Sequence, residues 1–169
     1  MDQAENKESL MPNEGRGEDA LLVSVFHLGN AMFGIPAAQI QEVVQMGSVT
    51  PVHHAPGFIV GIRNLRGRIV TVIDLGMRLE LGAAACSSAS RILIVDSDGE
   101  LIGLLVDRVD DTVFLQAEDM SPAPSNLGAL HESALRGVYR CPQGLVTLLD
   151  HSPILKHSEG RSVPSVASR

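Results

Sequence analysis

Short runs of alternating apolar and polar residues fill most of this chain and predict β-strands. Residues 22–28 and 31–35 flank Gly29-Asn30, a pair that tolerates positive φ and favours a two-residue hairpin turn. A second hairpin is predicted where two apolar runs flank Ser-Asp-Gly-Glu at 97–100. The remaining strand-like runs are 41–46, 61–65, 68–75 and 109–115. Short strands at regular spacing with glycine turns favour small barrels or a sandwich over an open sheet.

Three short segments carry helical signals instead. Pro36 begins one helical turn at 36–40, where its missing N–H costs nothing, and Pro153 lies near the start of another at 152–155. A third short helix is predicted over 127–135. We therefore expect a mostly β protein with short helices.

An internal repeat indicates two similar β units. Residues 61–74, GIRNLRGRIVTVID, recur in register as 137–150, GVYRCPQGLVTLLD. A glycine, a threonine and an aspartate occupy matching positions, and the apolar alternation is kept. Such a repeat predicts two small barrels packed on one another. The first copy alone carries three arginines around its turn.

The rest of the chain suggests one domain with two tails. Residues 1–20 hold six acids and two bases without apolar periodicity, which predicts a disordered acidic lead-in. The polar stretch 156–169 predicts a flexible C-terminal tail. Between them, 21–155 is expected to form a single domain, with the small residues of 82–90 marking the seam between its halves.

Composition and charge exclude several function classes. The chain has no Trp, one Tyr and a net charge of −7, which argues against nucleic-acid binding through a basic face with stacking aromatics. No apolar run approaches the roughly 20 residues needed to cross a bilayer, and the N-terminus lacks the pattern of a signal peptide. Cys86 and Cys141 have no metal-ligand spacing. We expect a cytoplasmic protein without direct membrane contact.

Two patterns could support catalysis or metal binding. Asp74 and Asp150 end equivalent strands, so a carboxylate pair of the aspartic-protease type is one hypothesis; the other is that each aspartate accepts hydrogen bonds from the turn after it. The adjacent pair His53-His54 lacks the spacing of helical metal ligands. The sequence offers neither a nucleophile elbow nor a glycine-rich phosphate loop. We predict a protein that is not an enzyme and has no cofactor or metal.

The arginine-rich turn is the strongest candidate site. Arg63, Arg66 and Arg68 lie within six residues, so they must either meet carboxylates or contact a partner. The alternatives are a solvated charged turn and a protein-contact site, because arginine is enriched at interface hot spots. Glu42 is the candidate acid to hold one of the three.

The chain resembles a known family, the CheW-like coupling proteins of bacterial chemotaxis. The resemblance runs from about Leu22 to Leu155 and is strongest in the segment APGFIVGIRNLRGRIVTVIDL. It implies two packed SH3-like five-stranded β-barrel lobes with short helices. It also implies a non-catalytic adaptor that couples chemoreceptors to the histidine kinase CheA. The alternative is the same role in a non-flagellar pathway, such as twitching motility or surface sensing.

The resemblance also implies partners and site residues. The partners would be the cytoplasmic tips of chemoreceptors and the regulatory domain of the kinase, with the protein recruited to membrane-bound receptor arrays. By motif, the implied receptor-binding residues are Ile40, Glu42, Thr50, Gly61, Asn64 and Arg66. Kinase contacts are not assigned to individual residues. His53-His54 and Gly76 depart from the usual family residues, which bears on partner choice.

Overall fold

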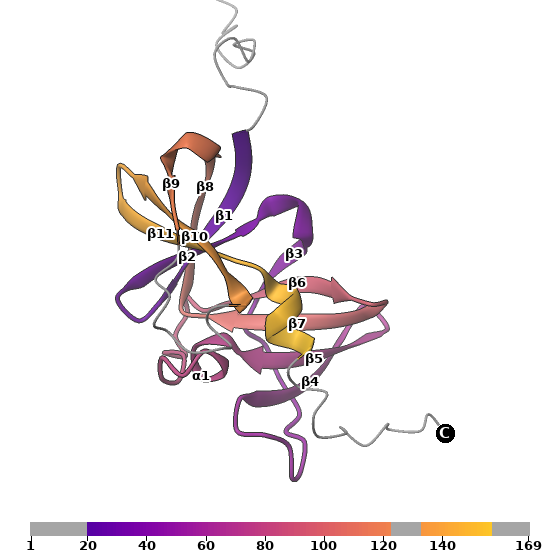
Figure 1. Cartoon of the computed structure of the whole chain (residues 1–169). Helices are drawn as coiled ribbons and strands as arrows, with labels where there is room; N and C mark the ends of the chain where they lie inside the picture. Colours follow the sequence, from indigo (N-terminus) through magenta and orange to yellow (C-terminus); the bar gives the residue numbers. More distant parts are fainter. Residues whose placement is uncertain (1–19, 123–132, 157–169) are drawn as a thin grey trace, which may run out of the picture.

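The computed structural model describes residues 20–122 and 133–156, which form two β-sheets with short helices (Figure 1). The predicted tails lie outside this range, except that Ala20 begins the first strand and Lys156 ends the last helix. Most of the helix predicted over 127–135 also lies outside it. The elements are β1 (Ala20–Leu28), β2 (Ala31–Pro36), η1 (Ala37–Gln39), β3 (Ile40–Gln45), β4 (Ile59–Leu65), β5 (Arg68–Asp74), α1 (Leu75–Arg78), β6 (Arg91–Ser97), β7 (Glu100–Val106), β8 (Arg108–Gln116), η2 (Ala117–Asp119), β9 (Met120–Ser121), β10 (Leu135–Cys141), β11 (Gly144–Leu149) and α3 (His151–Lys156).

Each sheet forms one lobe, and the chain passes from one lobe to the other and back. The six-stranded lobe has the order β8-β1-β2-β11-β10-β9, and the five-stranded lobe has the order β3-β6-β7-β5-β4. Each combines antiparallel hairpins with one parallel pair, β11 with β2 and β5 with β7. Figure 1 shows the two sheets beside one another. A mostly β fold of two packed lobes is confirmed.

The two lobes share the same strand register. In the six-stranded lobe, Gly34 of β2 lies opposite Val25 of β1 and Leu148 of β11. In the five-stranded lobe, Gly103 of β7 lies opposite Ile94 of β6 and Val72 of β5. The residue numbers of equivalent positions therefore differ by 69 between β1–β3 and β6–β8, and by 76 between β4–β5 and β10–β11. The chain is a tandem repeat, β1–β5 followed by β6–β11.

The repeats and the lobes do not coincide. The segment 82–90 does separate the repeats, since it joins α1 to β6. It does not separate the lobes, because β5 before it and β7 after it pair within one sheet. Each lobe thus takes strands from both repeats. The segment 82–90, expected from composition to separate the halves of the domain, therefore separates the two sequence repeats but not the two lobes.

Both sheets curl so that their edges meet through a continuation of one edge strand. In the five-stranded lobe, the chain leaving β3 returns at Thr50 and bridges Ile62 of β4, with two N–H···O bonds of 2.8 Å. In the six-stranded lobe, the chain leaving β8 returns as β9, where Ser121 lies opposite Val138 of β10. Ile62 and Val138 are equivalent. The sixth strand is therefore the counterpart of the Thr50 bridge, and each lobe is a barrel built on five strands.

Three apolar clusters hold this arrangement. One fills the six-stranded lobe around Val23 and Val146, and a second fills the five-stranded lobe around Val70 and Ile92. The third lies between the lobes and draws on both sheets. Its buried members include Phe26, Leu28, Phe33, Ile35, Ile73, Leu75, Leu93, Leu104, Leu149 and Ile154. Burying this much apolar surface between the lobes fixes them against each other.

Candidate functional site

The β4–β5 hairpin turns through Arg66 and Gly67, both with positive φ. The φ angles are 52° at Arg66 and 82° at Gly67, as a tight two-residue hairpin turn requires. Asn64 stabilises the turn, since its Oδ1 accepts a hydrogen bond of 2.8 Å from the Gly67 N–H. A non-glycine residue with positive φ costs conformational energy and often marks a functional position. The turn places Arg66 at the end of the hairpin.

Glu42 on β3 forms an ion pair with Arg66, in a hydrogen bond from Nη2 to Oε1. Glu42 lies on the edge strand β3 and Arg66 lies in the turn that follows the edge strand β4, and they meet because the sheet curls into a barrel. The Arg66 side chain is 74% exposed and that of Glu42 is 29% exposed. The prediction that Glu42 holds one of the three arginines is confirmed.

The other two arginines of the turn region have different surroundings. Arg63 donates from Nη1 to the Gln45 carbonyl, at 2.7 Å, and its guanidinium lies against Gly47. It therefore ties β4 to the end of β3. Arg68 begins β5 and is exposed. Of the three, Arg66 is both fixed by a carboxylate and open to solvent.

Thr50 and Gly61 lie at the barrel closure. A side chain at Gly61 would collide with the Thr50 carbonyl, and the φ of 154° at Gly61 also disfavours other residues. Gly61 is buried and Thr50 is exposed. These two positions fix the distance between the β3 extension and β4, and hence the place of the Glu42–Arg66 pair.

Ile40 stands at the start of β3, on the other side of a bulge from Glu42. Ile40 lies opposite Val95 and Glu42 opposite Ile94, so Gln41 is the extra residue between them. Ile40 is partly buried and packs against the cluster between the lobes. The structure thus brings Glu42, Asn64 and Arg66 together at one corner and sets Ile40 at the inner end of the same strand.

Two exposed apolar residues near this corner escaped the sequence analysis. Val43 on β3 is 43% exposed, and Ile69 on β5, which lies opposite Asn64, is 60% exposed. Both lie in alternating strands, where one face is expected to be polar. Ile69 could have been identified from the sequence, because it immediately follows the arginine-rich turn.

Asp74 and Asp150 do not form a catalytic pair. Asp74 caps α1, accepting from the Met77 N–H at 3.1 Å, and its second oxygen accepts from the Ala84 N–H at 2.9 Å. Asp150 accepts from the Ser152 N–H at 3.0 Å in the equivalent place beside the other lobe. Each carboxylate serves the turn after its own strand, as the structural alternative predicted.

The environment of Asp150 shifts its ionisation. Burial alone would raise the pKa of this carboxyl, but hydrogen bonds from Ser152 and the Arg136 guanidinium outweigh burial. The Arg136 Nη2 lies 3.1 Å from Asp150 Oδ2. The pKa of Asp150 therefore lies below its ordinary value, and the charged form is favoured in the folded protein.

The remaining candidate chemistry is sparse across 20–122 and 133–156. No group of three or more His, Cys, Asp or Glu side chains in these ranges could hold a metal ion. His53 and His54 are exposed. Within the same ranges, no helix is long and apolar enough to cross a membrane.

A model of the CheW-like domain matches residues 23–159 of the sequence. The chain belongs to the CheW-like family. It is 30% identical over 159 residues to the chemotaxis protein CheW of Klebsiella aerogenes, with 94% of each chain covered. It is 29% identical to Protein FrzA of Myxococcus xanthus, covering 82% of this chain and 87% of the relative. The fold is similar to the crystal structure of the scaffolding protein TtCheW from Thermoanaerobacter tengcongensis, at a TM-score of 0.72 and 30% identity over 79% of this chain and 91% of that one.

Membership of the CheW-like family confirms the function class expected from the resemblance. CheW proteins are non-catalytic chemotaxis scaffolds that couple receptors to CheA, so the hydrolase hypothesis is set aside. The local bonding of Asp74 and Asp150 agrees with this assignment. The partners of this CheW-family chain are components of a chemotaxis signalling complex.

Proposed function

We propose that this CheW-family protein binds the cytoplasmic tip of a chemoreceptor at the corner formed by Glu42, Asn64 and Arg66, and holds the regulatory domain of a CheA-type kinase elsewhere on its surface. The observation that carries the proposal is the Arg66 side chain, which is exposed, yet fixed by Glu42 at the end of a rigid hairpin. A fixed cation loses less entropy on binding than a free one does.

The contribution of the Glu42–Arg66 ion pair to protein stability does not explain why an arginine stands at this position. Exposed ion pairs contribute little to folding, about 0.2–1 kcal/mol. The positive φ of Arg66 costs energy that a glycine there would avoid. An arginine held at such a position is better explained by a contact with a partner, since its guanidinium can bind a carboxylate with two hydrogen bonds.

A helical receptor tip suits the surroundings of this corner. Val43 follows Glu42 on β3 and Ile69 lies opposite Asn64 on β5, both with exposed apolar side chains, and Ile40 lies at the inner end of β3. An amphipathic helix would place apolar residues against such side chains and polar residues against Arg66. Thr50 and Gly61 would act by fixing the barrel edge. The protein would work in the cytoplasm, recruited to receptor arrays.

A reversal of charge at Arg66 tests the proposal, with Arg68→Glu as the matched control. Both arginines are exposed and belong to the same hairpin, but Glu42 holds only Arg66. We expect Arg66→Glu to weaken binding to a soluble receptor-tip fragment at least tenfold in isothermal titration, and Arg68→Glu to change it less than threefold. Circular dichroism would check that each variant is folded. Unchanged receptor affinity in folded Arg66→Glu would contradict the assigned site.

A further inference from the structure

Within the described ranges, the chain passes from one lobe to the other at two short connections. The first is η1, which joins β2 of the six-stranded lobe to β3 of the five-stranded lobe. The second is Asp107, which lies between β7 and β8. The register makes the two connections equivalent, so Gln39 in the first corresponds to Arg108, just after the second. The side chains of Gln39 and Arg108 have different partners.

Gln39 is bound to the helix that follows the last strand. Its Oε1 accepts a hydrogen bond of 2.8 Å from Nδ1–H of His151, the first residue of α3. His151 is buried, with 7% of its surface exposed. The offset of 76 equates it with Leu75, which begins α1 and is fully buried. A buried imidazole in place of a leucine costs free energy unless it is hydrogen-bonded, so the contact with Gln39 explains how His151 is tolerated there.

The helix that carries His151 is held from both repeats. Asp150, directly before it, pairs with Arg136, with 3.1 Å between Oδ2 and Nη2. Toward the other end of α3, the Ile154 carbonyl accepts a hydrogen bond of 3.1 Å from Nε of Arg78 in α1. The start of α3 is therefore a fixed point for the connection to which His151 binds.

The second connection is held differently. Arg108 turns back to β1, where its Nη2 lies 3.2 Å from His27 Nε2. Asp107 accepts hydrogen bonds from the backbone N–H groups of Gly29 and Ala85, at 2.7 and 2.9 Å. A buried side chain of the other repeat thus binds the equivalent position only at the first connection, as far as the described residues show.

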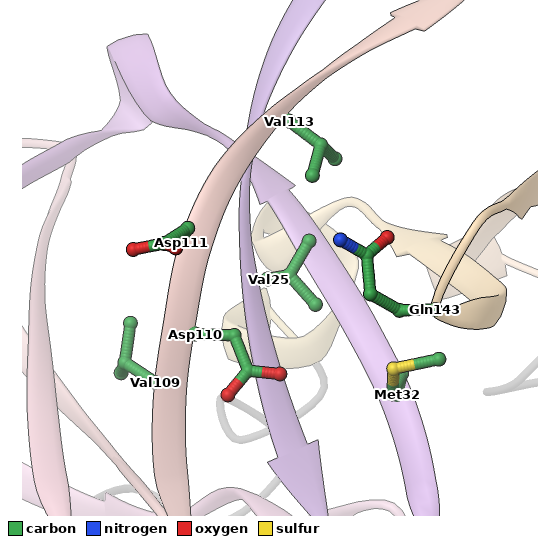
Figure 2. A pocket seen from close by; sticks show the side chains of 7 residues that line it. All are labelled: Val25, Met32, Val109, Asp110, Asp111, Val113 and Gln143. Atoms are coloured by element: carbon green, nitrogen blue, oxygen red, sulfur yellow. The ribbon is translucent and has the colours of Figure 1, made fainter.

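The strand that follows the second connection borders a hollow in its own lobe. This hollow has a volume of about 400 Å³, and Asp110, Asp111 and Gln143 are among the residues that line it. Figure 2 shows Asp110 directed from β8 toward the side where Val25 and Met32 lie. These residues all belong to the six-stranded lobe. The first connection leads instead into β3, the strand of the proposed receptor corner.

We propose that His151, acting through Gln39, is a positioning residue for receptor binding; the inference rests on the function proposed for the Glu42–Arg66 corner. Gln39 directly precedes Ile40, which begins β3 and packs against the cluster between the lobes. Glu42 follows across the bulge. The hydrogen bond that holds η1 on α3 fixes the inner end of β3 before the receptor arrives, so less conformational entropy is lost on binding.

Hydrogen exchange in the free protein tests the positioning. His151→Leu copies the residue at the equivalent position and removes the donor without leaving a buried polar group, so its thermal midpoint should be no lower than that of the wild type. The Ile40 N–H donates to the Ala37 carbonyl in η1. We expect it to exchange about threefold faster or more in His151→Leu. An unchanged exchange rate would overturn the inference.

Titration with the soluble receptor-tip fragment tests the consequence for binding. His151→Leu and Gln39→Met should each weaken binding about threefold or more. His151→Asn should stay within about twofold of the wild type, because its amide N–H can replace the Nδ1–H donor. A loss of stability without a loss of affinity in Gln39→Met would make the bond a stabilising contact alone and overturn the inference.

Arg66→Glu, measured beside these variants, separates this inference from the proposed function. Wild-type affinity in folded His151→Leu, together with weakened binding of Arg66→Glu, would overturn the role of His151 and leave the receptor site in place. If both variants bind as the wild type does, the receptor site is wrong and the inference falls with it.

Discussion

The β4–β5 and β10–β11 hairpins stand at equivalent places in the two lobes, yet their turns differ. The first turns through Arg66-Gly67, with positive φ at both residues, and the second through Pro142-Gln143. The bulges at the base of the two hairpins coincide, and the aspartate at the end of each hairpin accepts a backbone hydrogen bond from the turn that follows, Asp74 from Met77 and Asp150 from Ser152. The shared residues therefore build the barrel, while the turn is free to differ. That division separates the structural part of each hairpin from the part available to a partner.

Substitution of the glycine at each barrel closure should give the largest difference in stability between the two lobes. Gly61 and Gly137 are equivalent, but a side chain at Gly61 meets the Thr50 backbone and a positive φ, while one at Gly137 mainly meets the flexible side chain of Met120. We expect Gly61→Ala to lower the free energy of unfolding by about 3 kcal/mol and Gly137→Ala by about 1 kcal/mol. Urea denaturation of both variants measures the difference. Equal losses would mean that the two closures are under the same strain.

Asp150 should contribute to the pH dependence of stability. The pKa of Asp150 is lowered in the folded protein, so its contribution to stability is present above the pKa of an unfolded aspartate, about 4, and is lost as the pH falls through the folded value. Asp150→Asn should lower the free energy of unfolding at pH 7 by about 1 kcal/mol and reduce its fall at acidic pH. Denaturation curves between pH 7 and pH 2 check this. A variant whose pH profile matches that of the wild type would contradict the assignment.

The smallest expected effect concerns the Glu42–Arg66 pair itself. Because Arg66 is mostly exposed, Glu42→Gln should change the free energy of unfolding by no more than about 0.5 kcal/mol. The same variant should weaken receptor binding, since Arg66 is then no longer fixed. A cycle with Arg66→Ala measures their coupling in both stability and binding. Strong coupling in stability without any in binding would make the pair a structural feature.

Local signals in the sequence predicted the strands and several contacts. The turn at Gly29-Asn30 and the Ser-Asp-Gly-Glu turn each join the predicted hairpins. The helical turn after Pro36 is η1, and the one near Pro153 is α3. The hydrogen bonds of Asp74 and the pairing of Glu42 with Arg66 were also expected from residue type and position. These features depend on neighbours in the chain or on one carboxylate facing one arginine.

The pairing of strands that lie far apart in the sequence could not be predicted from such local signals. The parallel pairs β5–β7 and β11–β2 join strands from different repeats, and an alternating apolar pattern does not specify which neighbour a strand chooses. The two-residue β9 is too short to leave a periodic signal. The hollow lined by Asp110, Asp111 and Gln143 could not be predicted either, because only the barrel brings β8 and the β10–β11 turn together.

The exchange of strands between repeats has a consequence for synthesis on the ribosome. The five-stranded lobe is continuous from Ile40 to Val106, so all its strands are available once that stretch has emerged. The β1–β2 hairpin is made first but must wait for β8 and β11, its neighbours in the finished sheet. The first hairpin to be translated is thus among the last to be completed. Until then its apolar faces are unprotected, and a nascent chain halted before β8 would be exposed to chaperones and proteases.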